Sequence, residues 1–467
     1  MATPSPRPLK FWDLALYAVA MTLALRWIAA AAAAGPAALP LWVLAMVGFM
    51  GPLVIATAEL VGRFEGDGGL YAWGRETLGP FFGFLSGWIY WTCNIPYFSG
   101  MLVFIVNVIG LASPAPVQTA LKDPLIFLLA CISLSVGVAG LHLLGLGAGK
   151  WLSNFGAAAG ATLLAILVLT GVALAAKGAS ATPFAHASYI PHFSADIAIL
   201  WGTMVFAFGG PEALAFLRND VEGGLNQVLK VLAVVAFILT AAYLAGTSAM
   251  LAILSPEQAT RLSGLPEALM TGLGRLGLGY LAPSVLVILA LSLIGGYSSW
   301  FGVAARLPFV AGVDHVLPSA FAYRSPKTGA PSVSIIVQST AIISLVLLSQ
   351  SGSGLKAAYD WLVSMSVLSY TLPFAFLFMI YLVAIERPAI AGAWSPPGGR
   401  TTSRLIGWVG LAVALSAIIC TLVPSPDEAD KVGATLKLVG ASIILIAVGA
   451  GFYGLAQLRA RSSSPSD

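Results

Sequence analysis

The sequence predicts an all-helical protein that crosses a membrane twelve times, and three observations support this fold class. Hydrophobic residues make up 58% of the 467 residues, whereas charged residues make up only 9%. The mean hydropathy is +0.92, and a soluble globular domain carries about 25% charged residues. Stretches of about ten residues that alternate between apolar and polar side chains, which are typical of membrane-spanning barrels, are absent. The chain is therefore expected to lie in lipid.

Twelve segments meet the length of about 20 apolar residues that one membrane-spanning helix requires. They lie near residues 13–34, 40–62, 80–110, 124–145, 150–176, 196–217, 227–254, 280–306, 331–349, 357–385, 404–423 and 434–457. The connections between them are short, so residues 1–467 are expected to form a single membrane domain. Small residues in the first segment resemble a signal peptide, but Asp13 and Arg26 within it argue against cleavage.

Lys and Arg residues are distributed unequally between the two sides of these predicted helices. When the connections are assigned alternately, 15 of the 23 residues fall on the side of both termini and 7 on the other. The positive-inside rule then predicts a multi-pass protein of the cytoplasmic (inner) membrane with both termini in the cytoplasm. The net charge of +4 follows from this topology and does not indicate nucleic-acid binding.

Residues that would carry enzymatic or metal chemistry are scarce. Cys93, Cys131 and Cys420 all lie within apolar segments, where they are expected to pack against neighbours. The four histidines show no metal-ligand spacing, and no catalytic dyad can be identified. We therefore expect no metal, no cofactor and no enzymatic activity, and a membrane-embedded enzyme is the weakest alternative.

The sixth segment is interrupted by Gly209-Gly210-Pro211-Glu212. Pro211 has no amide hydrogen and clashes with the carbonyl of Ala207, while the two glycines leave helical geometry at low steric cost. A break within hydrocarbon is tolerated where it lines a polar cavity, so it predicts a binding site. A kink used only for packing is the alternative. Glu212 is a candidate for proton exchange, for amine binding, or for capping the second half-helix.

The first segment places a guanidinium within the bilayer. Arg26 follows Asp13 by 13 residues, which is roughly 20 Å into a core about 30 Å thick. Such a charge needs a partner, and three roles compete: binding a substrate carboxylate, replacing a coupling ion as a fixed cation, or pairing with Glu212 or another acid. Five segments separate the two interrupted helices, so they would have opposite orientations, as in an inverted repeat with discontinuous helices 1 and 6.

On this basis helices 1–5 form a first repeat at 13–176, helices 6–10 form a second at 196–385, and helices 11–12 follow at 404–457. The residues expected to bind substrate surround the two breaks or face them from helices 3 and 8. They are Ala24, Leu25, Arg26, Trp27, Asn94, Tyr97, Phe206, Phe208, Gly209, Gly210, Pro211 and Tyr297. Helix 8 also offers hydrogen-bonding groups in the stretch Gly295-Gly296-Tyr297-Ser298-Ser299-Trp300, and Tyr359, Asp360 and Tyr370 in helix 10 are weaker candidates for an outer gate.

Four charged residues are candidates for coupling or gating: Arg26, Glu212, Glu59 and Asp13. For Glu59 the alternative is a helical pair with Arg63, four positions further on. For Asp13 it is a simple interaction with the positive end of the first helix.

Several short motifs resemble, in order and spacing, those of permeases of the amino acid–polyamine–organocation (APC) superfamily between about residues 13 and 385. They are Ala58-Glu59-Leu60, Gly68-Gly69-Leu70-Tyr71-Ala72-Trp73, Gly87-Trp88, Tyr90-Trp91, Phe206-Ala207-Phe208-Gly209-Gly210-Pro211-Glu212, Ala305-Arg306, Leu317-Pro318 and Gly329-Ala330-Pro331. The resemblance implies a LeuT-like (APC) fold with a 5+5 inverted repeat. It also suggests a role for Glu59 at an inner gate.

The chain departs from the superfamily pattern at three places. Glu65 stands where many relatives carry a proline before the Gly-Gly-Tyr-like motif. Ala24-Leu25-Arg26 stands where relatives carry a Gly-Ser-Gly-like triplet in helix 1. Gly160 stands where some proton-coupled members carry a lysine in helix 5, which favours a fixed-cation role for Arg26.

These features predict a secondary active transporter, a permease that moves a small amino acid or related amine by alternating access, linked to protons or working by exchange. Its expected partners are this small molecule, protons and the lipid bilayer, without nucleic acid, and the sequence does not indicate an oligomeric state. Two alternatives stay open: a polyamine or organic-cation permease, and a non-transporting ligand sensor of the same fold.

Overall fold

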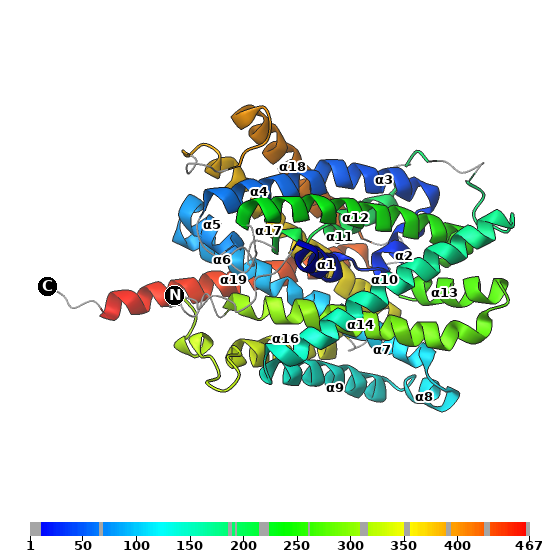
Figure 1. Cartoon of the computed structure of the whole chain (residues 1–467). Coiled ribbons are helices and arrows are strands. Elements are labelled where there is room, and N and C mark those ends of the chain that lie inside the picture. Colours follow the sequence, from blue (N-terminus) through cyan, green and yellow to red (C-terminus); the bar gives the residue numbers. More distant parts are fainter. Residues whose placement is uncertain are drawn as a thin grey trace.

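The structure is a computed structural model, and it describes residues 11–64, 69–184, 189–191, 194–213, 224–259, 262–308, 316–349, 355–388, 394–424 and 430–463. Every regular element in these ranges is a helix, and most of the long helices run in roughly the same direction (Figure 1). The all-helical fold class is therefore confirmed for this part of the chain. Ten of its helices are long and apolar enough to cross a membrane. The total of twelve stays a prediction.

Both interruptions expected from the sequence are present. The first helix consists of α1 (Phe11–Thr22) and α2 (Arg26–Ala32), which are separated by a non-helical break. The sixth begins as α11 (Ala195–Ala207) and leaves helical geometry before Pro211, where a single 3-10 turn follows. Neither half of the first helix is long enough to span a bilayer alone, since each residue of an α-helix adds only about 1.5 Å.

The other helices that form or continue the apolar segments follow in chain order, and α5, α8 and α13 lie in the connections between them. They are α3 (Ala38–Ala45), α4 (Gly51–Arg63), α6 (Pro80–Thr92), α7 (Asn94–Ala112), α9 (Pro124–Leu143), α10 (Leu146–Ala176), α12 (Gly224–Ile253), α14 (Ala282–Ala304), α16 (Ser332–Ser349), α17 (Leu355–Ala384), α18 (Gly399–Thr421) and α19 (Lys431–Ser463), with the short α5 (Gly69–Leu78), α8 (Ala115–Ala120) and α13 (Gly264–Arg275). A π-turn at Met46–Met50 joins α3 to α4, and Cys93 alone separates α6 from α7.

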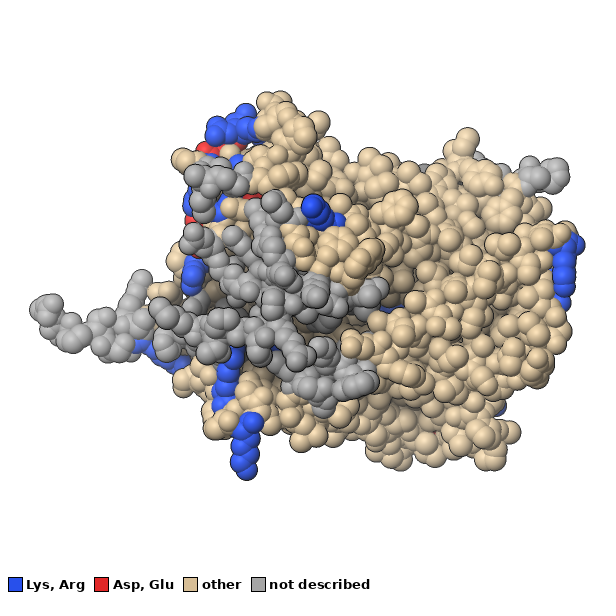
Figure 2. All heavy atoms as spheres, in the orientation of Figure 1, with Lys and Arg blue, Asp and Glu red and all other residues tan. Residues whose placement is uncertain are grey.

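The two ends of the molecule differ in their short helices and in their charge. The end that carries α5 lies on the left of Figure 1 and is here called the α5 side; the end that carries α8 and α13 lies on the right and is called the α13 side. On the face shown in Figure 2, Lys and Arg side chains gather mainly at the α5 side. Because α11 begins on the α13 side, Glu212 lies beyond the second break, towards the α5 side.

The helices pack in two groups. In the first group, α12 lies against α1, α2, α3 and α4, and α11 lies against α2 and α3. In the second group, α7 lies against α6, α9, α14 and α16. Two long helices connect the groups, since α10 contacts both α12 and α14, and α17 contacts both α11 and α7. Two bodies joined by a few elements form an arrangement in which one body can move against the other.

One very close backbone contact in this connection joins α10 to α14. A Cβ atom placed on Gly295 would lie 2.5 Å from the Cα atom of Gly156, and one placed on Gly156 would lie 2.6 Å from the Cα atom of Gly295. Glycine at both positions lets the two backbones approach directly, which is a common way for helices to associate within lipid.

Gly295→Ala is expected to push α10 and α14 apart and to reduce the stability by about 1–3 kcal/mol, the usual cost of overpacking a closed interior. Gly296→Ala is the matched control, because the nearest atom to its added Cβ is Met101 Cε at 3.7 Å. Thermal unfolding of both variants in one detergent measures the difference. Equal unfolding temperatures for the two variants would contradict the packing argument.

Candidate functional site

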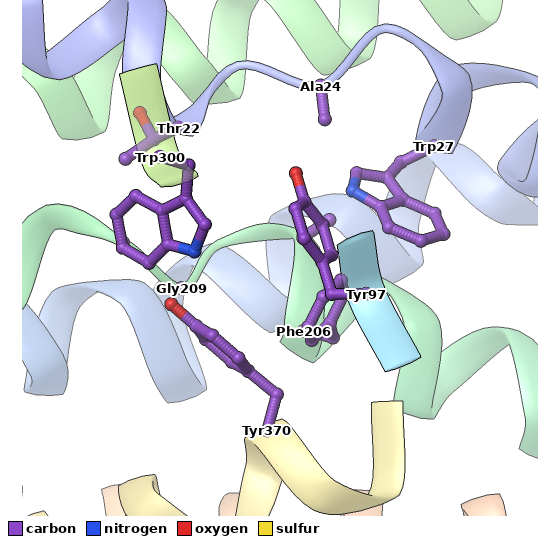
Figure 3. Close-up of a pocket in the computed structure, with 10 residues that line it drawn as sticks. Thr22, Ala24, Trp27, Tyr97, Phe206, Gly209, Trp300 and Tyr370 are labelled. Atoms are coloured by element: carbon purple, nitrogen blue, oxygen red, sulfur yellow. The ribbon is translucent and has the colours of Figure 1, made fainter. Parts of the chain in front are cut away.

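A small cavity lies where the two interrupted helices lose their helical geometry (Figure 3). Its wall combines residues from both breaks with aromatic residues of facing helices. The lining residues are Thr22, Ala24 and Trp27 from the first break, Phe206, Ala207, Gly209 and Gly210 from the second, and Tyr97, Trp300 and Tyr370 from α7, α14 and α17. Both helix groups therefore contribute to one cavity.

The cavity is too small for an amino acid in this structure. Its volume is about 30 Å³, and one water molecule needs at least about 10–15 Å³ on the same measure. Aromatic rings occupy the space, because the ring of Phe206 lies edge-on to Trp27 at a centroid distance of 5.1 Å and to Tyr370 at 4.9 Å. A larger molecule fits only after these rings move apart.

The second break depends on glycine at two positions. Gly210 has a φ of +125°, and a Cβ atom there would lie 2.4 Å from Cγ2 of Thr22. A Cβ atom on Gly209 would lie 2.5 Å from the ring of Phe374. The absence of side chains thus lets the second break touch both the first break and α17.

The first break contains no glycine, and a contact from a distant helix holds it. The amide nitrogen of Ala24 donates to the hydroxyl of Tyr243 on α12 over 3.4 Å. The same hydroxyl donates to the carbonyl of Ala207 at the end of α11 over 3.0 Å. Sequence analysis did not select Tyr243, because it lies 219 positions from Ala24 in an ordinary apolar helix.

The guanidinium of Arg26 lies behind two of the lining residues. Its Cζ atom is 4.3 Å from the ring centroid of Trp27 and 4.7 Å from that of Tyr97. The residue is 2% exposed, and its Nε and Nη1 atoms have no hydrogen-bond partner among the described residues. Within the same part of the chain it forms no ion pair, so the structural pair with Glu212 is not present. Among the described residues, the two aromatic faces of Trp27 and Tyr97 stabilise this charge, each by about 0.5–2 kcal/mol.

The buried carboxylate of Glu212 connects the second break to two other helices. Its Oε1 atom accepts a hydrogen bond of 2.8 Å from the hydroxyl of Tyr90 on α6, and the hydroxyl of Tyr370 lies 3.5 Å away. Its Oε2 atom accepts from the amide of Gly210 over 2.8 Å. The carboxylate therefore joins the second break to α6 and α17, and its role as a cap of the second half-helix stays a prediction.

The expected binding residues differ in their position relative to the cavity. Those that line it are Ala24, Trp27, Tyr97, Phe206, Gly209 and Gly210. Asn94 does not line it, but its Oδ1 atom accepts from the indole N–H of Trp300, which does. Phe208 and Tyr297 are fully buried among other aromatic rings of the core. Leu25, Arg26 and Pro211 flank the lining residues in the chain without being among them.

Four lining residues were absent from the expected set of binding residues. They are Thr22, Ala207, Trp300 and Tyr370. Trp300 is one of the hydrogen-bonding groups expected in helix 8, and Tyr370 is a weaker candidate for an outer gate. Thr22 and Ala207 are the last residues of α1 and α11, so a lining position follows from where each helix stops. The last residues of these two helices cannot be read from the sequence alone.

Glu59 does not line the cavity. It lies in the last turns of α4 and is fully buried. Its Oε1 atom accepts from Arg63 over 2.6 Å and from Ser395 over 2.8 Å. Its Oε2 atom accepts from Tyr381 over 2.7 Å and from Ser403 over 2.8 Å. The expected helical pair is present, and it also ties α4 to α17, to α18 and to the connection between them.

Asp13 belongs to α1, but its side chain lies outside the described part of the structure, so its gating role stays a prediction.

A membrane-spanning helical protein with two interrupted helices around a central cavity has the architecture of a secondary transporter. The amino acid permease family model matches residues 9–453, and the chain belongs to this family. The predicted APC membership is thereby confirmed. So are the prediction of a permease and the prediction that the protein is not an enzyme, since this is a family of transporters.

Relatives cover most of the chain at low identity. An uncharacterized transporter of Legionella pneumophila is 24% identical over 429 residues, which cover 90% of each protein. A glutamate/γ-aminobutyrate antiporter of Lactococcus lactis is 23% identical over 400 residues, covering 83% of this chain and 78% of the antiporter. A probable agmatine/putrescine antiporter of the same species is 21% identical over 293 residues, covering 62% and 60%.

Solved structures share the fold. Two crystal structures of a manganese transporter of Eremococcus coleocola superpose with TM-scores of 0.53 and 0.55 at 14% sequence identity. They cover 99% of this chain and 98% and 99% of the transporter chains. At this identity the likeness concerns the architecture and not the substrate.

Glu59→Ala is expected to lower the stability by about 3 kcal/mol, because it leaves the mostly buried guanidinium of Arg63 without its carboxylate. The control is Glu386→Ala, which removes a 2.7 Å ion pair with Arg404 at the exposed surface. Exposed ion pairs contribute little, so the control should keep the wild-type unfolding temperature. A similar fall of the unfolding temperature in both variants would show that the Glu59 contacts stabilise the protein no more than an exposed ion pair does.

Proposed function

We propose that this protein transports amino acids by alternating access, that the substrate binds between the two helix breaks, and that Arg26 binds its carboxylate. The observation that carries this proposal is the buried guanidinium beside the cavity with two unpartnered nitrogens. A cation at the centre of a bilayer costs at least about 2.5–3.5 kcal/mol. A substrate carboxylate supplies the missing hydrogen bonds and the opposite charge.

The surroundings of Arg26 suit a substrate that carries both charges. A guanidinium offers paired N–H groups that match the two oxygens of a carboxylate. Trp27 and Tyr97 cover it in this structure, so these rings must turn aside when the carboxylate arrives. The faces of Trp300 and Tyr370 then remain for the ammonium group, which aromatic rings attract by cation–π interaction.

The alternative role for Arg26 is that of a fixed cation in place of a coupling ion. The two roles differ in what they require of the substrate. A fixed cation is needed for the transport of every substrate, whereas a carboxylate-binding residue is needed only for substrates that carry a carboxylate. Amines related to the substrate therefore separate the two roles.

Alternating access uses the two helix groups. The first group carries both breaks, and the second group carries Tyr97 and Trp300 on the opposite wall. Movement of one group against the other separates these walls and opens the cavity to one side at a time. The small volume in this structure fits a state in which the walls are closed on each other.

Glu212 is proposed to link this movement to protons. As a carboxylate it accepts hydrogen bonds from Tyr90 and from the amide of Gly210. When it gains a proton, one oxygen becomes a donor, and the hydrogen bond which that oxygen accepted is disrupted: the bond from Tyr90 at Oε1 or the bond from Gly210 at Oε2. The bridge between the second break and α6 thus changes with the protonation of a single side chain, as proton-linked gating requires.

The α5 side is proposed to face the cytoplasm, which places both termini there and the protein in the cytoplasmic membrane. The reason is the gathering of Lys and Arg at this side (Figure 2), because positively charged connections stay inside during membrane insertion.

Amino acids are expected to compete for uptake at least about tenfold better than the amines formed from them by loss of carbon dioxide, since hydrogen bonds to charged groups contribute about 1.5–3 kcal/mol. Suitable pairs are arginine with agmatine, ornithine with putrescine, and phenylalanine with phenethylamine. Proteoliposome uptake of a labelled substrate, found first by a thermal-shift screen of amino acids, provides the measurement.

Arg26→Gln should abolish amino acid uptake, and any binding that persists should no longer distinguish an acid from its amine. Arg404→Gln is the control, because Arg404 forms an exposed ion pair. Amines that compete as well as their parent acids in the wild type would overturn the carboxylate assignment and favour an organic-cation permease. Amine transport that also requires Arg26 would favour the fixed cation.

Glu212→Gln is expected to reduce uptake strongly and to remove its dependence on pH, because the amide keeps the size of the side chain but exchanges no proton in this range. Glu267→Gln on α13 serves as the control, since the Glu267 side chain is exposed and does not line the cavity. Uptake is measured with and without a proton gradient. A Glu212→Gln variant with the wild-type pH profile would rule out this group as the proton site.

A further inference from the structure

We infer that the hydroxyl of Tyr243 locks the two helix breaks to each other, and that Tyr243 is thereby a positioning residue for the substrate site. The inference rests on the proposed function for its effect on substrate binding. Its structural part stands on two hydrogen bonds. One comes from the amide of Ala24, and the other goes to the carbonyl of Ala207. Both of these residues line the cavity.

One hydroxyl serves both breaks because it is donor and acceptor at once. The amide of Ala24 lies in the break before α2, and the carbonyl of Ala207 lies at the end of α11. Groups at helix ends lack partners within their own helix, and lipid offers none. Tyr243 pairs one such group from each break through a single oxygen atom. A third helix, α12, therefore holds α2 and α11 together at the breaks, in addition to the direct contact between Trp27 and Phe206.

The ring of Tyr243 is itself held firmly. It stacks on Trp42 at a centroid distance of 4.4 Å with an angle of 6° between the planes. Phe208 lies edge-on to it at 5.5 Å. The indole N–H of Trp42 donates to Thr247, one turn further along α12, over 3.0 Å. Side chains of α3, of the end of α11 and of α12 thus fix where the hydroxyl of Tyr243 lies.

This arrangement matters for transport because the cavity has a wall on each helix group. Ala24, Trp27 and Phe206 belong to the first group, and Tyr97 and Trp300 belong to the second. If the breaks stay locked, the wall formed by the first helix group keeps its shape while the two groups move against each other. Without the hydroxyl, α2 and α11 can separate, and the binding residues no longer arrive together.

Tyr243→Phe tests the inference, because it keeps the ring and its stacking on Trp42 but removes the hydroxyl. The matched control is Thr240→Val. It removes a buried hydroxyl from the same helix, and that hydroxyl donates within α12 to the carbonyl of Ala236 over 2.8 Å. Three measurements apply to both variants: thermal unfolding, amide hydrogen exchange by mass spectrometry, and affinity for the amino acid that binds the wild type.

For Tyr243→Phe we expect amide exchange in peptides that cover residues 22–27 and 207–210 to rise by about tenfold. The amide of Ala24 loses its acceptor, and the end of α11 opens more often once the carbonyl of Ala207 loses its donor. Affinity for the amino acid should fall by about fivefold to tenfold. Thr240→Val should leave exchange at both breaks and affinity at wild-type levels. A rise at only one break, or an equal rise in the control, would overturn the lock.

The outcome is distinguishable from failure of the proposed function. Hydrogen exchange is measured without substrate, so it tests the lock even if no amino acid binds. Unchanged exchange at both breaks in Tyr243→Phe refutes the lock whatever the protein transports. Raised exchange with unchanged amino acid affinity refutes the positioning role alone.

Discussion

The structure depends on one constraint: backbone groups freed by a helix break within lipid must find partners inside the protein. Each break meets this constraint in its own way. The second break uses the side chain of Glu212, which accepts from the amide of Gly210. The first break uses Tyr243, whose hydroxyl also serves the end of α11. Because Gly210 carries no side chain, it can approach Thr22 closely, and the two breaks meet at one cavity.

The buried cation follows from the same environment. Arg26 is held between the faces of Trp27 and Tyr97, and two of its nitrogens have no hydrogen-bond partner among the described residues. Aromatic faces offset only part of the cost of removing a guanidinium from water. A carboxylate that completes its hydrogen bonds would bind more tightly than the rings do. The same feature thus gives a reason for substrate affinity and for the rearrangement of Trp27 and Tyr97 on binding.

A feature of this site could be predicted from the sequence only where neighbouring residues themselves signal it. The second break was evident, because Gly209, Gly210 and Pro211 cannot continue a helix in lipid. The first break has no such signal and was located only through Arg26. Tyr243 could not be found, since its partners lie far away in the chain. Phe208 was expected at the site with Phe206, but it packs against Trp42, because the chain turns at that residue and the two side chains point to different sides.

The central claim is that substrate binds at the two breaks, and protection of a single cysteine tests it most directly. Ala24→Cys would be prepared in a chain whose Cys93, Cys131 and Cys420 are replaced, with Ser319→Cys on the α5 side as an exposed control. The rate of labelling by a maleimide is then measured with and without a transported amino acid. The account predicts that the amino acid slows labelling at position 24 and leaves position 319 unchanged. Equal rates at position 24 with and without saturating substrate would contradict it.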